Sequence, residues 1–99
     1  MGYTFAQFMN EESLLHVSVL LFAVLRDALG RDEIEVSIPV GVGSTPDVAA
    51  LLAACAAQYP KISSWLPHIR VAVNQEYSSS DTLLQQGDEI AFIPPVAGG

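Results

Sequence analysis

The chain has 99 residues, of which 51% are hydrophobic and 15% charged, so its composition indicates one folded domain and excludes a disordered segment. Its four basic and 11 acidic residues give a formal net charge of -7, which argues against binding to nucleic acid or to an anionic membrane. The lone cysteine, Cys55, excludes an internal disulfide, and residues 1–10 lack a signal-peptide pattern, so the sequence predicts a cytoplasmic protein.

The first half of the chain predicts two strands. Residues 1–15 show neither a hydrophobic period nor turn chemistry, and we expect them to form a mobile N-terminal extension before a domain over residues 16–95. Residues 16–24 are β-branched or aromatic and apolar on both faces, which is typical of a central strand. A short helical turn over residues 25–30 follows. Strict alternation over residues 33–38 then predicts a strand with one solvated face.

The strongest helix signal comes next. Thr45 is a good N-cap, and Pro46 fits the first helical position, so we expect the helix to begin there. Apolar residues recur behind them at helical spacing and predict one buried stripe. The stripe comprises Val48, Leu51, Leu52, Cys55 and Tyr59.

Further strands are expected after the helix. We predict an irregular connection over residues 61–68, an alternating strand over residues 69–74, a short strand near Leu83 and Leu84, and a last strand over residues 89–93. This order of elements predicts an α+β domain. Its mixed sheet should have four to five strands, with one main helix packed across one face.

The sequence ends in an unusual tail. Pro94 and Pro95 stop the last strand, because proline cannot donate a ladder hydrogen bond, and together they hold the backbone extended. The residues after them are Val96, Ala97, Gly98 and Gly99. Glycine has no Cβ, so another protein's backbone can approach such a terminus closely. We therefore expect residues 96–99 to form a flexible tail that presents the Gly99 carboxylate as the reactive group.

Three segments carry a resemblance to a known family. The C-terminal segment is similar to the end of the sulfur-carrying small subunit of molybdopterin synthase, in which Gly-Asp-Glu, an apolar strand and Pro-Pro-Val precede Gly-Gly. The segments that match are Leu84–Gly99, Val19–Ala23 with Arg26-Asp27 and Leu29-Gly30 behind it, and Val71–Gln75. The resemblance covers residues 17–99 and implies a ubiquitin-like β-grasp fold.

The resemblance also implies a carrier that is not catalytic alone. In that family an adenylating partner enzyme consumes ATP to convert the C-terminal carboxylate, here that of Gly99, into an acyl-adenylate. Sulfur transfer then gives a thiocarboxylate. The tail enters the large subunit of the synthase and donates its sulfur to form the dithiolene of the molybdenum cofactor. No cofactor would be held permanently, since the nucleotide pocket and the catalytic side chains belong to the partners.

An apolar docking surface on the sheet near the tail is a further implication. Phe22, Tyr77 and Ile93 occupy the matching positions, and Arg26 matches an arginine near the tail. Strand alternation is compatible with this, because it places Phe22 and Ile93 on the face opposite to the side chains that immediately precede them. A core position for Phe22 and a merely solvated Arg26 stay open as alternatives.

Other functions also stay open. The chain could serve as a sulfur carrier for thiazole synthesis or another thiocarboxylate pathway, or as a ubiquitin-like interaction module or protein modifier without sulfur chemistry. Pro-Pro-Val before the diglycine favours the molybdenum pathway. Cys55 lies on the helical stripe, and we expect it to pack in the core. No metal site is expected, because His16 and His68 have no ligand partners at suitable spacing.

Overall fold

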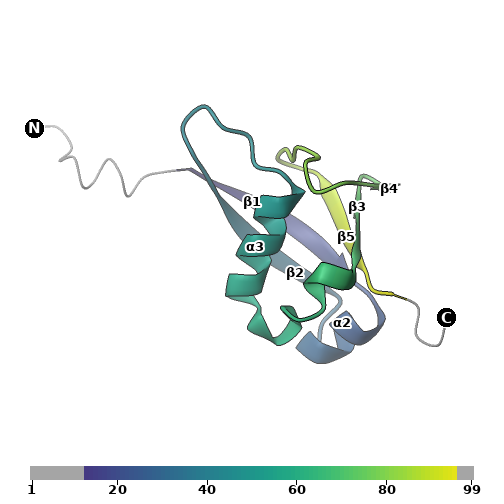
Figure 1. Ribbon diagram of the computed structural model, residues 1–99. Coiled ribbons are helices and arrows are strands. Elements are labelled where there is room, and N and C mark those ends of the chain that lie inside the picture. The colour runs from purple at the N-terminus through teal and green to yellow at the C-terminus, as the bar shows by residue number, and fades with distance from the viewer. Residues whose placement is uncertain (1–12, 96–99) are drawn as a thin grey trace, which may run out of the picture.

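The computed structural model describes residues 13–95, which form a mixed sheet with one long helix lying across one face (Figure 1). The strands are β1 (Ser13–Leu21), β2 (Glu33–Val40), β3 (Arg70–Val73), β4 (Glu76–Tyr77) and β5 (Glu89–Ile93). The helices are α2 (Ala23–Leu29), α3 (Val48–Gln58) and two 3-10 turns, η1 (Pro60–Ile62) and η2 (Leu66–His68). The sheet order is β2-β1-β5-β3-β4. β1 and β5 are parallel and the other pairs antiparallel, which confirms the predicted mixed α+β sheet.

Strand β1 lies between β2 and β5, so the prediction of a central first strand is confirmed. Its bounds differ from the expected ones at both ends. It begins at Ser13, so residues 13–15 belong to the sheet and not to the expected extension. It ends at Leu21, because Ala23 has a positive φ of 52° and turns the chain into α2. Alanine is not a typical turn residue, so nothing in this apolar run of the sequence indicates that the strand ends and the chain turns here.

The start of α3 differs from the prediction. The N-cap is Asp47 and not Thr45, since the Asp47 carboxylate accepts a hydrogen bond from the Ala50 N–H at 2.9 Å. Pro46 lies outside the helix. Its carbonyl accepts from the Leu84 N–H at 2.9 Å, which ties this segment to a loop far along the chain. Tertiary pairing therefore moved the helix start by two residues from the position that local capping rules favour.

The predicted stripe of α3 faces the core. Val48, Leu51 and Cys55 are buried, whereas Leu52 is half-buried. Tyr59 is the C-cap residue directly after the helix and is also half-buried. Beneath the helix lie the inward-facing side chains of the sheet, namely Val17, Val19, Leu21, Ile34, Val36, Ile38, Val71, Ile90 and Phe92. Helix and sheet thus share one core, and the opposite face of the sheet is left without a helix.

Two segments after α3 differ from expectation. Residues 61–68 are not irregular, because η1 and η2 place Ile62 and Leu66 in the core. The short strand is β4, and it lies earlier than the expected position at Leu83 and Leu84. Leu84 is instead a core residue, while Leu83 is exposed and forms an isolated bridge with Asp47.

Candidate functional site

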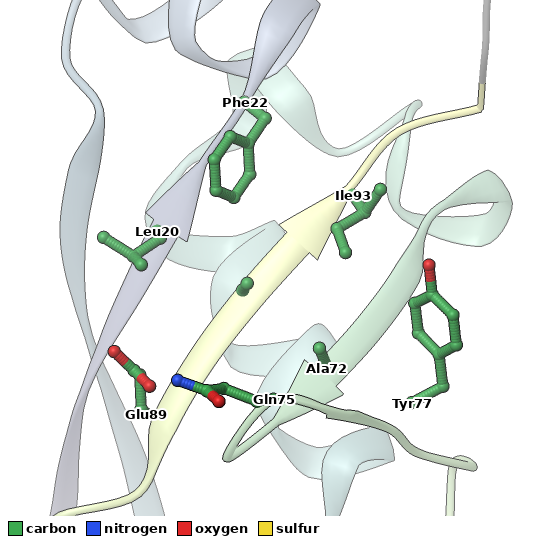
Figure 2. A pocket seen from close by; sticks show the side chains of 8 residues that line it. Leu20, Phe22, Ala72, Gln75, Tyr77, Glu89 and Ile93 are labelled. Atoms are coloured by element: carbon green, nitrogen blue, oxygen red, sulfur yellow. The ribbon is translucent and has the colours of Figure 1, made fainter.

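The open face of the sheet carries a groove of about 460 Å³. Its lining residues come from β1, β3, β4 and β5 and their ends, and they are Leu20, Phe22, Ala72, Gln75, Tyr77, Glu89, Ala91 and Ile93. Figure 2 shows Phe22 and Ile93 at the end where β5 leads toward the C-terminus, and Gln75 and Glu89 at the other end. The groove is therefore apolar next to the tail and polar away from it.

Sheet alternation explains why these side chains share a face. Leu20 on β1 pairs with Ala91 on β5, and Ala91 pairs with Ala72 on β3, so the three form one row across the sheet. The alanines form a low floor because their side chains are small. Larger side chains stand around that floor, which makes the surface concave.

Phe22 is the apolar wall of the groove on the β1 side. It follows the last residue of β1, has extended backbone at φ -130°, and is the N-cap residue of α2. Its side chain is 44% exposed, so the alternative that Phe22 is simply a core residue is wrong. An aromatic side chain left this open beside other apolar groups is a usual component of a protein-binding surface.

Tyr77 forms the wall on the β4 side. It pairs with Ala72 and is 63% exposed. The Arg70 guanidinium stacks on its ring, with 4.8 Å between Cζ and the ring centroid. Arg70 is also the register partner of Ile93, which places a cation beside the end of β5. The stacking stabilises the position of the tyrosine ring at the edge of the groove.

The predicted docking residues are brought together only in part. Phe22, Tyr77 and Ile93 line one groove, but Arg26 does not. Arg26 lies exposed on α2, with its Nε 3.9 Å from the Asp27 carboxylate, as a solvated surface pair would. Their roles in partner binding stay predictions.

Sequence reasoning missed the remaining lining residues, which are Leu20, Ala72, Gln75, Glu89 and Ala91, and it missed Arg70 beside them. Leu20, Ala72 and Ala91 could have been found from strand alternation, because each has the parity of a predicted docking residue or faces one across the sheet. Arg70 could not have been found in this way. Its stacking on Tyr77 depends on the β3–β4 hairpin, whose turn residues Asn74 and Gln75 both have positive φ.

The tail leaves the sheet directly from this groove. Ile93 lines the groove, Pro94 behind it is buried, and Pro95 is exposed. β5 itself is held on both sides, by β1 and by β3, so the point where the tail begins is fixed. Val96, Ala97, Gly98 and Gly99 lie outside the described residues, and the reactivity expected of Gly99 stays a prediction.

The open face is acidic at the polar end of the groove and beyond it. Glu33 and Glu35 on β2 pair with Leu20 and Ser18 and so share their face, and Glu89 pairs with Ser18 from the other side. Within residues 13–95 none of these three carboxylates has an Arg or Lys at ion-pair distance. An approaching basic surface would therefore be attracted to this side of the sheet.

Other reactive groups are scarce in the described part of the chain. Cys55 is fully buried, and burial raises the pKa of its thiol to about 11, which leaves almost no thiolate at neutral pH. Among residues 13–95, no group of three or more His, Cys, Asp or Glu side chains could hold a metal ion. The helices in the same range are all too short or too polar to cross a membrane.

Comparison with known proteins shows the family of the chain. Residues 19–99 match the ThiS family. A molybdopterin synthase sulfur carrier subunit from Dictyostelium discoideum is 40% identical, over 82% of this chain and 93% of that protein. The protein of the same name from Escherichia coli is also 40% identical, over 84% and 99%. Small archaeal modifier protein 1 of Haloferax volcanii has the same fold at 28% identity, with a TM-score of 0.68 over 83% of this chain and 99% of the other. The chain therefore belongs to the ThiS family of ubiquitin-like β-grasp proteins, among the relatives of the molybdopterin synthase sulfur carrier subunits.

Proposed function

We propose that this protein is the sulfur carrier subunit of a molybdopterin synthase and that Gly99 carries the sulfur. One observation supports this most directly: Ile93 both lines the apolar groove and ends the strand that leads into the diglycine tail. A partner seated in the groove would therefore receive the tail at a defined position. The names of the relatives from Dictyostelium and Escherichia coli support the same function.

The chemistry would take place at the terminal carboxylate. A carboxylate is a poor acyl donor, so an adenylating partner enzyme would first let the Gly99 oxygen attack the α-phosphorus of ATP, with pyrophosphate leaving. Hydrosulfide would then attack the acyl carbon and expel AMP, which leaves a thiocarboxylate; a persulfide donor would give an acyl disulfide, which a thiol would have to reduce to the same product. The thiocarboxylate sulfur would then displace an oxygen substituent from a carbon of the pterin precursor held by the large subunit, and water would cleave the resulting thioester to restore the Gly99 carboxylate. The chain's own contribution is to bind, to orient the tail and to keep other nucleophiles away from it.

The large subunit is the partner proposed for the groove. Phe22, Tyr77 and Ile93 would supply the apolar contact, and the acidic side of the open face would speed encounter with a basic partner surface. We place this assembly in the cytoplasm, where ATP and a reducing environment are both available. No cofactor would be bound permanently, and the protein alone would show no activity.

Intact mass spectrometry tests the proposal. The purified chain is incubated with the adenylating enzyme, ATP and a sulfur donor, and the mass should rise by the replacement of one oxygen with sulfur. A chain that lacks Gly99 is the matched control, since it keeps every described contact and should stay unmodified. An unmodified full-length chain, with an adenylating enzyme shown to be active on another carrier, would contradict the proposal.

Attachment to other proteins is a second candidate function. The similarity to small archaeal modifier protein 1 favours it, because that protein shares the fold and 28% of the sequence and is named as a modifier. The same adenylated Gly99 would then be attacked by a lysine amine in place of sulfur. The two functions differ in product, since a modifier leaves a branched Gly99–lysine peptide after proteolysis.

A sulfur carrier for thiazole synthesis is a separate alternative. Co-purification with a pterin-binding subunit would support the molybdenum pathway, and co-purification with a thiazole synthase would support the thiazole pathway.

A further inference from the structure

Strand β2 is an edge of the sheet and therefore a potential site for strand addition. It has eight residues and pairs with β1 on one side only. In an antiparallel pair, alternate residues turn their backbone N–H and C=O groups away from the partner. Such a row of free groups is a template on which another chain can add a strand. Whether the outward N–H and C=O groups of β2 already have hydrogen-bond partners therefore decides whether another strand can pair with this edge.

The side chain of Gln58, the last residue of α3, occupies the middle of this edge. Its Oε1 accepts a hydrogen bond from the Ser37 N–H at 3.1 Å, and its Nε2 donates to the Ser37 carbonyl at 2.7 Å. Both outward backbone groups of Ser37 are thereby paired. An amide that accepts from one N–H and donates to the carbonyl of the same residue makes the two bonds that a neighbouring strand would make.

The residues on either side of Ser37 continue this protection. The Tyr59 hydroxyl donates to the outward Glu35 carbonyl at 2.8 Å. Pro39, two residues after Ser37 and so also turned outward, has no N–H to offer. Tyr59 is half-buried against the core and so holds the end of α3 in place over the edge.

We propose that Gln58 closes the β2 edge against a second copy of this chain. If the edge were free, two β2 strands could pair antiparallel about a two-fold axis near Ser37, since such a contact is self-complementary. The two sheets would then form one continuous sheet, and the core-facing side chains of Ile34, Val36 and Ile38 would lie beside those of the second copy. The side-chain amide of Gln58 prevents this pairing because it already hydrogen-bonds the Ser37 N–H and carbonyl, which the second strand would need.

The consequence concerns where partners can bind. The other edge of the sheet is β4, which has only two residues and offers little for strand pairing. With β2 closed as well, the described part of the sheet presents its open face as the surface for partners. This inference stands independently of the sulfur chemistry, because it concerns only the edge and the helix end.

Replacement of Gln58 by methionine tests the proposal, since Gln58→Met keeps the length of the side chain and removes its donor and acceptor. In dilute solution, NMR amide exchange at Ser37 should become about tenfold faster or more in the variant, because the outward N–H loses its partner. In concentrated solution the variant should dimerise by sedimentation equilibrium, and the Ser37 amide should regain protection. Gln86→Met makes the same change at an exposed turn residue that has no hydrogen bond to β2, and it should leave both measurements as in the native chain.

The result can overturn the proposal in three ways. A Ser37 amide that exchanges freely in the native chain would show that Gln58 does not close the edge in solution. A Gln58→Met chain that stays monomeric at high concentration would show that closure has no bearing on self-association. A dimer without renewed protection at Ser37 would place the contact elsewhere. Should the methionine variant fail to fold, Gln58→Ala removes the same two bonds with a residue that suits a helix end.

Discussion

Truncation of Phe22 should weaken binding to the large subunit while the chain stays folded. The side chain is 44% exposed, and an aromatic residue offers roughly 200 Å² in all, so about 90 Å² is available to a partner. At about 25 cal/mol per Å², complete burial of that area contributes about 2 kcal/mol to binding. Phe22→Ala should therefore raise Kd by up to about thirtyfold.

Isothermal titration of the purified large subunit with each carrier variant measures this effect. Leu83→Ala is the matched control, because Leu83 is 59% exposed but does not line the groove. It should leave Kd unchanged. Since part of Phe22 is already buried, thermal unfolding of each variant must show that the chain is folded at the titration temperature. If Phe22→Ala binds as tightly as the native chain, the groove is not the docking surface.

Three further predictions concern the stability and reactivity of the chain. Asp47→Ala should lower the free energy of unfolding by about 1 kcal/mol in urea titration, because it removes the N-cap hydrogen bond to the Ala50 N–H. If Thr45→Ala lowered this free energy as much or more, Thr45 would be the N-cap of α3, as expected from the sequence, and Asp47 would not. Phe92→Ala should cost about 3–5 kcal/mol, since its fully buried ring lies on the central strand β5, and a smaller loss would mean that the core refills the space. The Cys55 thiol should resist alkylation at pH 7 in the folded chain, and rapid labelling of the native protein would contradict its burial. The free energy of unfolding should fall as pH rises from 9 toward 11, because in that range the thiol, with its ordinary pKa of 9.0, loses its proton in the unfolded chain and keeps it in the folded one.

Much of the candidate site follows from patterns that are local in the sequence. Alternation places Phe22 and Ile93 on the face opposite to Leu21 and Phe92, and the structure shows that this is the face away from the core. The prolines after Ile93 likewise end β5 for a local reason, because proline has no N–H to donate to a neighbouring strand. Arg70 differs, because it meets Tyr77 only after the hairpin between β3 and β4 has formed. Nothing in the spacing of the two residues shows that their side chains stack.

The sequence by itself determined the type and order of the main elements, the stripe of α3 and the end of β5 before Pro94, because each depends on periodicity or on the backbone limits of proline. The tertiary structure alone decided where elements begin and what lies beside them. Pairing of Pro46 with Leu84 set the start of α3, and the fold brought Gln58 to Ser37, 21 residues away. The physical reason is that such hydrogen bonds join segments distant in the chain. A local pattern carries no information about a partner that only folding brings near.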